Sequence, residues 1–519
     1  MGAAGNDTVY YDPYRVDIVK NPYPVYRRLR EEAPLYYNSE YDFYAVSRFD
    51  DVQKGLSNHQ TFSSARGGIL ELIKANVEMP PGTFIFEDPP LHTVHRGVVA
   101  RIFTPRRMNG LDAMVREFTA RTLDALVGRD SFDVVADIGA QVPMRVIGML
   151  LGIPEQDLQA VRERADARLH TESGAPMSYD EGFSLAGGFE EYVDWRVNNP
   201  SDDVMTELLN VEFTDETGTQ RRLTREEILT FVNVLAGAGN ETTNRLIGWT
   251  VKTLAEHPDQ RRELAQNPAL IPEAIEEVLR FEPIGTHVGR YVARDVEYYG
   301  RTVPQGSAIL FLVGSANRDE RRFPDGDRFD IHRNRAPHVT FGSGIHTCPG
   351  NVLARLEGRI VLEELLKRFP EWEIDLDNAQ LSSTSTVRGW ETLPAFTSPA
   401  SARVAAAKQS GVKVEAAPAR EAPVEGEWTV TIKGPTGPMA TTLELQRIDG
   451  VLRGTQTGEG TTTPINEVSY ENGRIFWSNQ ITKPMKLKLE FSGTVDGSGM
   501  EGKVKTGFMG SFPFTAVKV

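Results

Sequence analysis

Apolar residues recur every three or four positions through most of residues 1–397. This spacing predicts amphipathic helices, because it places the apolar side chains on one helical face. Short strand-like runs separate these segments, and scattered strands among long helices indicate a mainly α fold with small β-sheets. The predicted helices are Asn21–Glu32, Arg107–Val127, Pro154–Leu169, Arg225–Glu256, Ile271–Phe281 and Asn351–Phe369, and the predicted strands are Phe43–Val46, Val288–Val292 and Ala308–Val313.

The pattern changes near Ser398. Residues 398–424 are rich in Ala, Pro, Ser, Lys and Glu and contain few large apolar residues, which is typical of a linker. Over residues 425–519 the apolar period becomes two, and Asp-Gly and Asn-Gly pairs stand where hairpins need a positive φ. We therefore expect a small antiparallel all-β barrel or sandwich. This part contains no His and no Cys, so we expect no transition-metal site within it.

Composition and charge narrow the class of protein. Hydrophobic residues make up 40% of the chain, which is ordinary for a globular protein. The formal net charge of −15 argues against a chain-wide affinity for nucleic acid or for an anionic membrane. No apolar run approaches 18 residues, and the N-terminus lacks a signal-peptide core. We expect a cytoplasmic protein without a membrane anchor.

The chain has one cysteine, Cys348. A single cysteine excludes intramolecular disulfides, CxxC redox pairs and four-cysteine iron–sulfur clusters within the chain. Three glycines surround it in the segment 341–350, and they permit a tight turn that points backbone N–H groups at the sulfur. The helix predicted to follow adds the positive end of its dipole, so the thiolate is favoured. Such a thiolate suits a nucleophile, a redox sensor or an axial metal ligand, whereas most lone cysteines are small buried hydrophobes.

The segment Phe341-Gly342-Ser343-Gly344-Ile345-His346-Thr347-Cys348-Pro349-Gly350 matches Phe-Gly-x-Gly-x-His-x-Cys-x-Gly at every fixed position. It resembles the haem-binding loop of the cytochrome P-450 family. The resemblance implies a haem b cofactor (iron protoporphyrin IX) with Cys348 as its proximal iron ligand. It also implies that Gly342 belongs to the cofactor-binding loop, that Phe341 shields the sulfur and that His346 contacts a haem propionate.

The segment Glu277-Val278-Leu279-Arg280 resembles the Glu-x-x-Arg motif of the same family, which belongs to a structural cluster. The two charged residues lie one helical turn apart and can pair. The downstream segment Phe323–Asp330 resembles the family's segment before the cysteine loop, although Gly326 stands where the family often has Pro. The resemblance implies that Arg328 completes a buried cluster with Glu277 and Arg280.

The predicted helix Arg225–Glu256 carries Ala238-Gly239-Asn240-Glu241-Thr242 at its centre. Glycine and β-branched residues are poor choices there. One interpretation is close packing against small residues. The other is that the Thr242 hydroxyl bonds back toward the Ala238 carbonyl and opens the helix. The segment resembles the family's oxygen site, formed by Ala238 and Gly239. The resemblance implies that Thr242 hydrogen-bonds dioxygen and that Glu241 relays protons.

Three further cationic residues match the family's propionate-binding positions. His92 and Arg96 are four residues apart and share a helical face. They precede Phe103-Thr104-Pro105, as in the family, and Arg290 follows the Glu277 helix. The resemblance implies that all three bind haem carboxylates. His95, which matches no such position, is expected to be structural.

The resemblance also places variable, largely apolar segments around the substrate. The loop Gly67–Phe86 is one, and it is unusually apolar for a connection, although its side chains could simply pack it onto the body. An apolar wall favours a hydrophobic substrate of the steroid, terpenoid or fatty-acid class. The predicted pocket residues are Ile69, Leu70, Val234, Ile284, Val288 and Trp390.

The implied reaction is monooxygenation, with O2 as oxidant. No cysteine cluster and no G-x-G-x-x-G after a strand is present, so electrons are expected from a separate ferredoxin and an NAD(P)H-dependent reductase. A basic patch near Cys348 would receive the ferredoxin, and its candidates are Arg101, Arg106, Arg107 and Arg355. The alternatives are a peroxygenase driven by hydrogen peroxide, against which Glu241-Thr242 argues, and a non-catalytic haem-thiolate sensor or binding protein.

Overall fold

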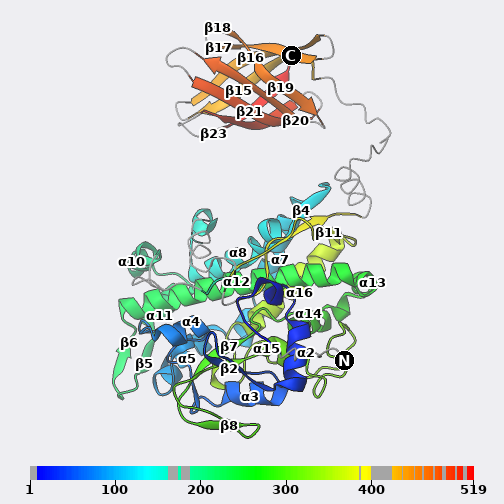
Figure 1. Ribbon diagram of the computed structural model, residues 1–519. Coiled ribbons are helices and arrows are strands. Elements are labelled where there is room, and N and C mark those ends of the chain that lie inside the picture. The colour runs from blue at the N-terminus through cyan, green and yellow to red at the C-terminus, as the bar shows by residue number, and fades with distance from the viewer. Residues whose placement is uncertain are drawn as a thin grey trace, which may run out of the picture. The chain divides into compact units, whose positions relative to one another are not determined.

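The chain divides into two compact units, Met1–Val412 and Lys413–Val519. The computed structural model describes residues 9–159, 161, 174–176, 188–384, 387–398, 424–434, 437–448, 451–458, 461–471, 474–481, 487–496, 499–506 and 511–519. Most of the predicted linker, 398–424, and the end of the predicted helix Pro154–Leu169 lie outside these residues. Each unit is described by itself (Figure 1).

The first unit is mainly helical, as predicted (Figure 1). The predicted helices over 225–256 and 271–281 are confirmed to the residue, and the predicted Arg107–Val127 is divided by a break at Gly110–Leu111. Its α-helices are α1 (Val16–Lys20), α2 (Tyr23–Glu32), α3 (Phe49–Ser57), α4 (Leu70–Ala75), α5 (Leu91–Ile102), α6 (Pro105–Asn109), α7 (Asp112–Asp124), α8 (Val142–Leu151), α10 (Glu190–Asn198), α11 (Val204–Asn210), α12 (Arg225–Glu256), α13 (Pro258–Gln266), α14 (Ile271–Phe281), α15 (Val313–Ala316) and α16 (Asn351–Arg368).

Helix α12 is the longest helix of this unit, and it runs across the width of the unit in Figure 1. Its 32 residues extend about 48 Å at 1.5 Å per residue. A capping box starts it: Thr224 Oγ1 accepts from Glu227 N (3.2 Å), and Glu227 Oε2 accepts from Thr224 N (2.7 Å). Helices α8, α14 and α16 pack against it, and apolar residues from all four form one continuous core.

Small sheets complete the first unit. The largest has the order β1-β2-β10-β7-β3, with β2 (Phe43–Val46) parallel to β10 (Ala308–Phe311) and the other pairs antiparallel. Its remaining strands are β1 (Leu35–Asn38), β3 (Phe62–Ser63) and β7 (Val288–Val292). Elsewhere β4 (Ser131–Asp133), β11 (Glu373–Ile374) and β14 (Pro394–Phe396) form one sheet, and β5 (Glu212–Thr214) with β6 (Gln220–Arg222), β8 (Val296–Tyr298) with β9 (Arg301–Val303), and β12 (Gln380–Leu381) with β13 (Trp390–Thr392) form pairs.

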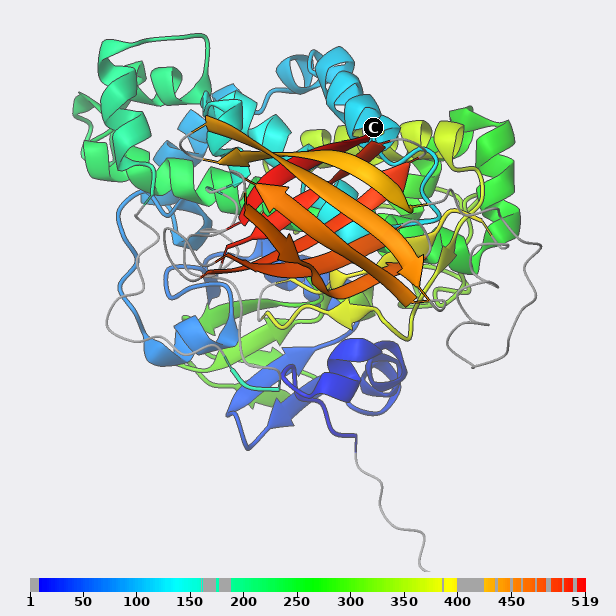
Figure 2. The same ribbon diagram turned by 90° about the horizontal axis from the view of Figure 1, so that it is seen from above.

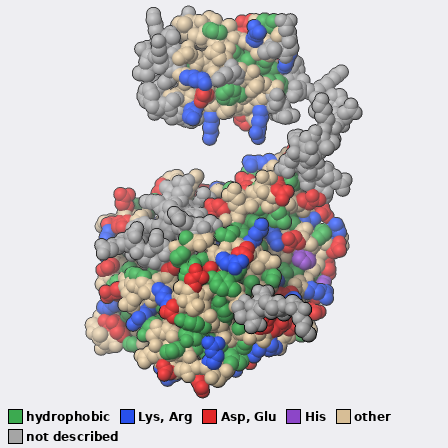
Figure 3. Space-filling view, in the orientation of Figure 1, with side chains coloured by type: hydrophobic (Ala, Val, Ile, Leu, Met, Phe, Trp, Pro, Cys, Tyr) green, Lys and Arg blue, Asp and Glu red, His purple; other side chains and the backbone are tan. Residues whose placement is uncertain are grey.

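Within the part of the chain that the structure describes, one segment is long and apolar enough to cross a membrane by length and composition alone. It is Val134–Leu151, which combines a π-helical turn, η2 (Val134–Gly139), with α8. Within the fold, 72% of this segment is buried, and its side chains belong to the core around α12. On the outside, acidic and basic side chains are interspersed over the face shown in Figure 3.

The second unit is one antiparallel sheet, which confirms the predicted β-domain. Its strand order is β18-β17-β16-β15-β23-β22-β21-β20-β19. The edge strands β18 and β19 follow each other in the chain with only Ile465 between them, so the sheet curls on itself (Figure 2). The strands are β15 (Gly426–Gly434), β16 (Gly437–Ile448), β17 (Val451–Gly458), β18 (Thr461–Pro464), β19 (Asn466–Glu471), β20 (Arg474–Ile481), β21 (Leu487–Asp496), β22 (Gly499–Lys505) and β23 (Ser511–Lys518).

Alternate residues of these strands fill the inside of the curled sheet. Trp428, Trp477 and Phe491 are fully buried, and the rings of Trp477 and Phe491 stack with centroids 4.5 Å apart. Gln456 Oε1 accepts from Trp477 Nε1 at 3.0 Å, so the buried indole N–H is satisfied. The period of two read from the sequence therefore corresponds to one apolar face closed around aromatic rings.

A buried charged cluster joins α5 to α12. Both oxygens of Glu87 lie 2.9 Å from His95 Nδ1, and Glu227 Oε1 lies 3.6 Å from His95 Nε2. Burial disfavours the imidazolium, but the carboxylates of Glu227 and Glu87 outweigh burial and raise the pKa of His95 to about 9. His95 is thus structural, and it is protonated at neutral pH.

This cluster predicts a pH-dependent stability. Because the folded protein binds the His95 proton more tightly than the unfolded chain, the stabilisation is complete below pH 6.5 and is lost as pH rises through about 9. Urea unfolding should show that the wild type loses up to about 3 kcal/mol more than His95→Gln between these pH values. Equal losses in the two proteins would contradict the assignment.

Candidate active site

The loop that carries Cys348 is held by its own backbone and by α3. Cys348 N donates to Phe341 O (2.8 Å), and Asn351 Nδ2 donates to Cys348 O (2.6 Å) at the start of α16. Gly342 and Gly344 both have φ of +73°, a region that favours glycine. A Cβ at Gly344 would lie 2.7 Å from Ser57 Cα, so the loop can approach α3 only with glycine there.

The thiol needs a positive partner to ionise. Burial raises the pKa of Cys348, and the Gly350 N–H together with the Arg96 and Arg355 guanidinium groups only partly offsets it. In the protein alone these groups therefore do not outweigh burial. A metal ion bound at the sulfur would supply further positive charge and would stabilise the thiolate.

Four cationic or imidazole groups converge beside this loop. Arg96 Nη2 donates to Thr347 O, and the rings of His92 and His346 lie 4.3 Å apart. Arg290 is buried on β7, and its Nη1 donates to Gly289 O (2.8 Å). The structure thus brings together His92, Arg96 and His346, three of the four residues that the sequence assigned to the propionates, and the charge of Arg290 acts on His346.

These groups have no acidic partner in direct contact among the described residues, although the Asp88 carboxylate acts on His92 and Arg290 from a greater distance. His92 Nε2 and His346 Nε2 are buried without a hydrogen-bond partner, and among the described residues neither Arg96 nor Arg290 forms an ion pair with an acidic side chain. Burial, followed by the charge of Arg96, lowers the pKa of His92 to about 4. Burial, followed by Arg290, His92 and Arg96, lowers the pKa of His346 to about 3. The two carboxylates of haem b fit this set, because they would pair the cations and satisfy the orphaned nitrogens.

The centre of α12 has one open face. Thr242 Oγ1 donates to Ala238 O at 2.6 Å, the back-bond that the sequence suggested. Ala238 is exposed although the helix around it is buried, and a Cβ at Gly237 would meet nothing within 4 Å. Gly239 packs against Ile147, where a Cβ would lie 3.1 Å from the side chain. Both interpretations of this segment therefore apply. Gly239 allows close packing on one side of the helix, and the Thr242 back-bond lies on the open side.

Glu241 lies on the buried side of the same turn. Its Oε1 accepts from Arg245 Nε at 2.8 Å and also from Arg245 Nη2. The two side chains are 7% and 4% exposed, so this ion pair is almost dry. Arg245 was not recognised from the sequence, although its position four residues after Glu241 is the spacing of a helical ion pair.

The cluster around Glu277 differs from the sequence prediction. Arg280 pairs with both oxygens of Glu277 (2.7 and 2.8 Å), but the third member is Arg333, whose Nε donates to Glu277 Oε1 at 3.1 Å. The predicted Arg328 has a side chain that is 67% exposed, and only its backbone O takes part, as acceptor from Arg280 and Arg333. The prediction of Arg328 was wrong because the turn at 325–328 directs its side chain to solvent.

This cluster supports the cysteine loop. Arg280 Nη1 donates to Asn317 O, and Asn317 in turn holds Val339 and Thr340 just before Phe341. Arg333 donates to Pro324 O and Asp325 O, so it fixes the preceding turn. No side chain of the cluster is among the cationic groups beside Cys348. Its role is therefore to shape the backbone that carries the thiol.

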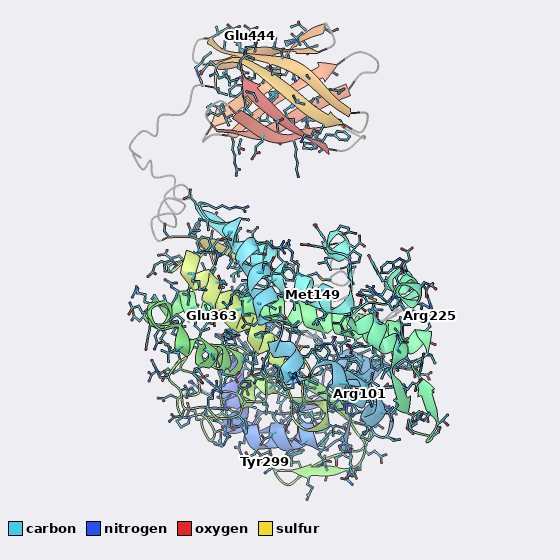
Figure 4. All side chains as sticks on the ribbon, turned by 180° about the vertical axis from the view of Figure 1, so that it is seen from behind. Arg101, Met149, Arg225, Tyr299, Glu363 and Glu444 are labelled. Atoms are coloured by element: carbon cyan, nitrogen blue, oxygen red, sulfur yellow. The ribbon has the colours of Figure 1, made fainter. Side chains whose placement is uncertain are left out.

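Two of the four arginines in the predicted basic patch form ion pairs with acidic residues of the chain. Arg101, labelled in Figure 4, and Arg106 are exposed on α5 and α6, and α6 packs against α16. Arg107 instead pairs with Glu207. Arg355 pairs with Glu276, and its guanidinium lies 4.5 Å from the centroid of the Phe341 ring. Arg101 and Arg106 remain the candidates for contact with an acidic partner.

A cavity of about 910 Å³ lies between the N-terminal segment, the end of α12 and the β12–β13 hairpin. Trp390 and Trp249 line it, as do Thr286 and His287. Its buried charges are compensated, because Glu282 accepts from Arg388 Nη1 (2.7 Å) and Tyr23 Oη (2.6 Å) and pairs with Arg318. Of the predicted pocket residues Trp390 lines this cavity, whereas Ile69, Leu70, Val234, Ile284 and Val288 do not and stay predictions for a wall nearer Cys348.

Known proteins were compared with the chain. The family model described as Cytochrome P450 matches residues 189–393. A protein named "Putative cytochrome P450 123" from Mycobacterium bovis is 37% identical over 75% of this chain and 97% of its own, and a vitamin D(3) 25-hydroxylase from Pseudonocardia autotrophica is 34% identical over 78% and 100%. The crystal structure of CYP109E1 from Bacillus megaterium with testosterone has a TM-score of 0.66 and 28% identity, over 74% of this chain and 99% of its own.

The Glu277 cluster predicts a difference between two nearby arginines. Arg333→Gln should lower the free energy of unfolding by at least about 2 kcal/mol, because it removes charge-assisted bonds to the buried Glu277. Arg328→Gln should change it by less than about 0.5 kcal/mol, since that side chain is exposed. Chemical unfolding of the two variants measures both values. Equal losses would restore Arg328 to the cluster.

Proposed function

The chain belongs to the cytochrome P450 family, whose members are haem-dependent monooxygenases, and we propose that it inserts one oxygen atom from O2 into a neutral hydrophobic substrate. The observation that carries the proposal is the convergence of one partly buried thiol, Cys348, with cationic and imidazole groups that form no ion pair with a described acidic side chain. Haem b, when bound, supplies the iron at which O2 is activated. The protein's own residues would bind the iron, orient the cofactor and deliver protons.

Cys348 would hold the cofactor iron as its thiolate. His92, Arg96, Arg290 and His346 would bind the two carboxylates of the cofactor and so fix its orientation beside the loop. Phe341 lies under the guanidinium of Arg355. In this proposal Phe341 shields the sulfur from water, which would keep the electron density of the sulfur available to the metal.

Thr242 is placed to handle a proton on the open face of α12. Its hydrogen is donated to Ala238 O, so the lone pairs of Oγ1 can accept a hydrogen bond from a molecule on that face. Glu241, on the adjacent buried side, is the acid that exchanges protons with solvent. Together they form the proton path that O2 chemistry requires, since each O–O cleavage consumes protons.

In this proposal one part of the substrate occupies the cavity that Trp390 lines, and its reacting carbon lies at the predicted wall nearer Cys348, because neither Cys348 nor Thr242 lines that cavity. The cavity volume of about 910 Å³ suits a medium to large ligand.

Of the described cations that line this cavity, the buried Arg318 and Arg388 are already paired with Glu282, Lys252 pairs with Glu256, and Lys20 is exposed at the surface. Burial lowers the pKa of His287 to about 4, so no described buried cation is left there for a carboxylate. This favours a neutral steroid or terpenoid over a fatty acid. Relatives named for vitamin D(3) hydroxylation and solved with testosterone support the same class.

Electrons come, in this proposal, from a separate ferredoxin and its NAD(P)H-dependent reductase. Arg101 and Arg106 are exposed on helices close to the cysteine loop. Their positive charge complements the acidic surface of a ferredoxin, although the whole chain carries a net charge of −15. The partnership places the enzyme in the reducing cytoplasm.

Turnover of testosterone tests the reaction. With NADPH, a ferredoxin and its reductase under ¹⁸O2, we expect one ¹⁸O atom per product molecule, measured by mass spectrometry. Thr242→Val should lower the yield of product per NADPH about tenfold or more, because it removes the proton-handling hydroxyl. Thr243→Val, the buried neighbour, is the control and should change it little.

Two other results would replace the proposal. Product formed with hydrogen peroxide alone, and none with NADPH and O2, would indicate a peroxygenase. Saturable binding of testosterone without product under either condition would indicate a binding protein. Hexadecanoic acid turned over in preference to testosterone would overturn the substrate class alone.

The ferredoxin contact has its own test. Arg101→Glu or Arg106→Glu should slow reduction by ferredoxin about tenfold at low salt, and the difference should shrink as salt is raised. Stopped-flow absorbance measures the rate. Arg15→Glu, at an exposed arginine in the N-terminal segment, is the control. An unchanged rate in both variants would place the docking surface elsewhere.

A further inference from the structure

Arg245 is a buried cation whose surroundings connect two parts of the site. It lies on α12, four residues after Glu241, and its side chain is only 4% exposed. A buried guanidinium is costly unless its charge and its donors are matched. Glu241 matches the charge, and Nη1 of Arg245 has no hydrogen-bond partner. The charge of Arg245 is therefore compensated, but its hydrogen-bonding capacity is not fully used.

The nitrogen Nη2 of Arg245, which donates to Glu241, also contacts the β12–β13 hairpin. Arg245 Nη2 donates to Ser382 Oγ at 2.9 Å, just after β12, and lies 3.9 Å from Glu391 Oε2 on β13. Both ends of the hairpin thus reach the same nitrogen. Between them, a Cβ at Gly389 would lie 2.3 Å from Cδ of Arg245, so only glycine leaves room for this arginine.

The hairpin is also a wall of the cavity. Ser382 and Trp390 line the cavity of about 910 Å³, and Trp390 packs on Trp249 with ring centroids 5.4 Å apart. A ligand that displaces the hairpin must therefore move the groups that hold Arg245. No other described basic side chain forms an ion pair with Glu241, so a movement of Arg245 changes the charge balance of that carboxylate directly.

We propose that Arg245 is a positioning residue that sets the orientation and charge of Glu241 and links it, through Ser382, to the occupancy of the cavity. In the free protein Arg245 holds the Glu241 carboxylate against α12. When a ligand pushes the hairpin, the guanidinium is drawn toward Glu391 and Glu241 is released to exchange protons. The inference rests on the proposed function of Glu241 and adds the regulation of that function.

The physical basis is the difference between a paired and a released carboxylate. Glu241 Oε1 already accepts from two nitrogens of Arg245, so the carboxylate is held in one orientation and this oxygen is poorly available to another donor. A proton carrier works best when both of its protonation states are accessible near the working pH. If a ligand in the cavity loosens the Arg245–Glu241 ion pair, Glu241 delivers protons only when a substrate is bound.

The first test does not depend on turnover. In Arg245→Gln, Glu241 becomes a buried carboxylate without a counter-ion, and it should protonate. Infrared difference spectra should then show a new protonated-carboxyl band that disappears in Glu241→Gln/Arg245→Gln. The double variant should also unfold at a higher urea concentration than Arg245→Gln alone, because it has no buried unpaired charge.

The second test measures proton delivery with testosterone as probe. The solvent deuterium isotope effect on NADPH oxidation should change at least twofold in Arg245→Gln, and Arg245→Lys should recover part of the wild-type value. Gly389→Ala, which displaces Arg245 without removing its charge, should change it in the same direction. Arg196→Gln is the matched control, because Arg196 is also buried in an ion pair, 2.8 Å from Asp203.

The outcomes separate this inference from the proposed function. If the wild type oxidises testosterone while Arg245→Gln and Gly389→Ala behave like Arg196→Gln, the positioning role is wrong and the monooxygenase stands. If the wild type shows no NADPH-dependent oxidation, the proposed function fails, and the infrared test still decides the positioning role. The absence of a new carboxyl band in Arg245→Gln would overturn that role.

Discussion

The partly buried sulfur of Cys348 is the constraint on which the proposed site in the first unit depends. Desolvation opposes its ionisation, and the nearby N–H and guanidinium groups offset only part of that opposition. A positive charge at the sulfur would stabilise the thiolate, and an anion among His92, Arg96, Arg290 and His346 would compensate those groups. A metal porphyrin with two carboxylates meets both needs in one molecule. The fold places the Cys348 sulfur and this group of cationic and imidazole side chains next to each other.

Three layers of structure serve that arrangement. The Glu277–Arg280–Arg333 cluster shapes the backbone before the thiol, and glycines at 342 and 344 let the loop turn and approach α3. Above it, α12 is buried along most of its length but opens at Ala238 and Thr242. Behind α12, Arg245 connects the acid Glu241 to the hairpin that lines the cavity. The first and the third of these layers use buried charges that are paired within the chain.

Much of this was predictable from the sequence, because local patterns determine it. The apolar period of α12 and α14 predicted both helices, and the switch to a period of two predicted the C-terminal sheet. The back-bond from Thr242 to Ala238 follows from a hydroxyl four residues after a carbonyl. What failed depends on distant contacts. Arg328 and Arg333 are both close to the turn at 325–328, and only the tertiary path of the chain decides which guanidinium reaches Glu277.

The role of Cys348 is tested most directly by the spectrum of the reduced protein with carbon monoxide. The account predicts the red-shifted Soret band of thiolate-ligated haem in the wild type, and its loss in Cys348→Ser with the fold retained. A protein that binds haem but lacks that band, or a Cys348→Ser variant that keeps it, would contradict the account. Either result would assign the iron to another ligand and remove the basis for the proposed chemistry.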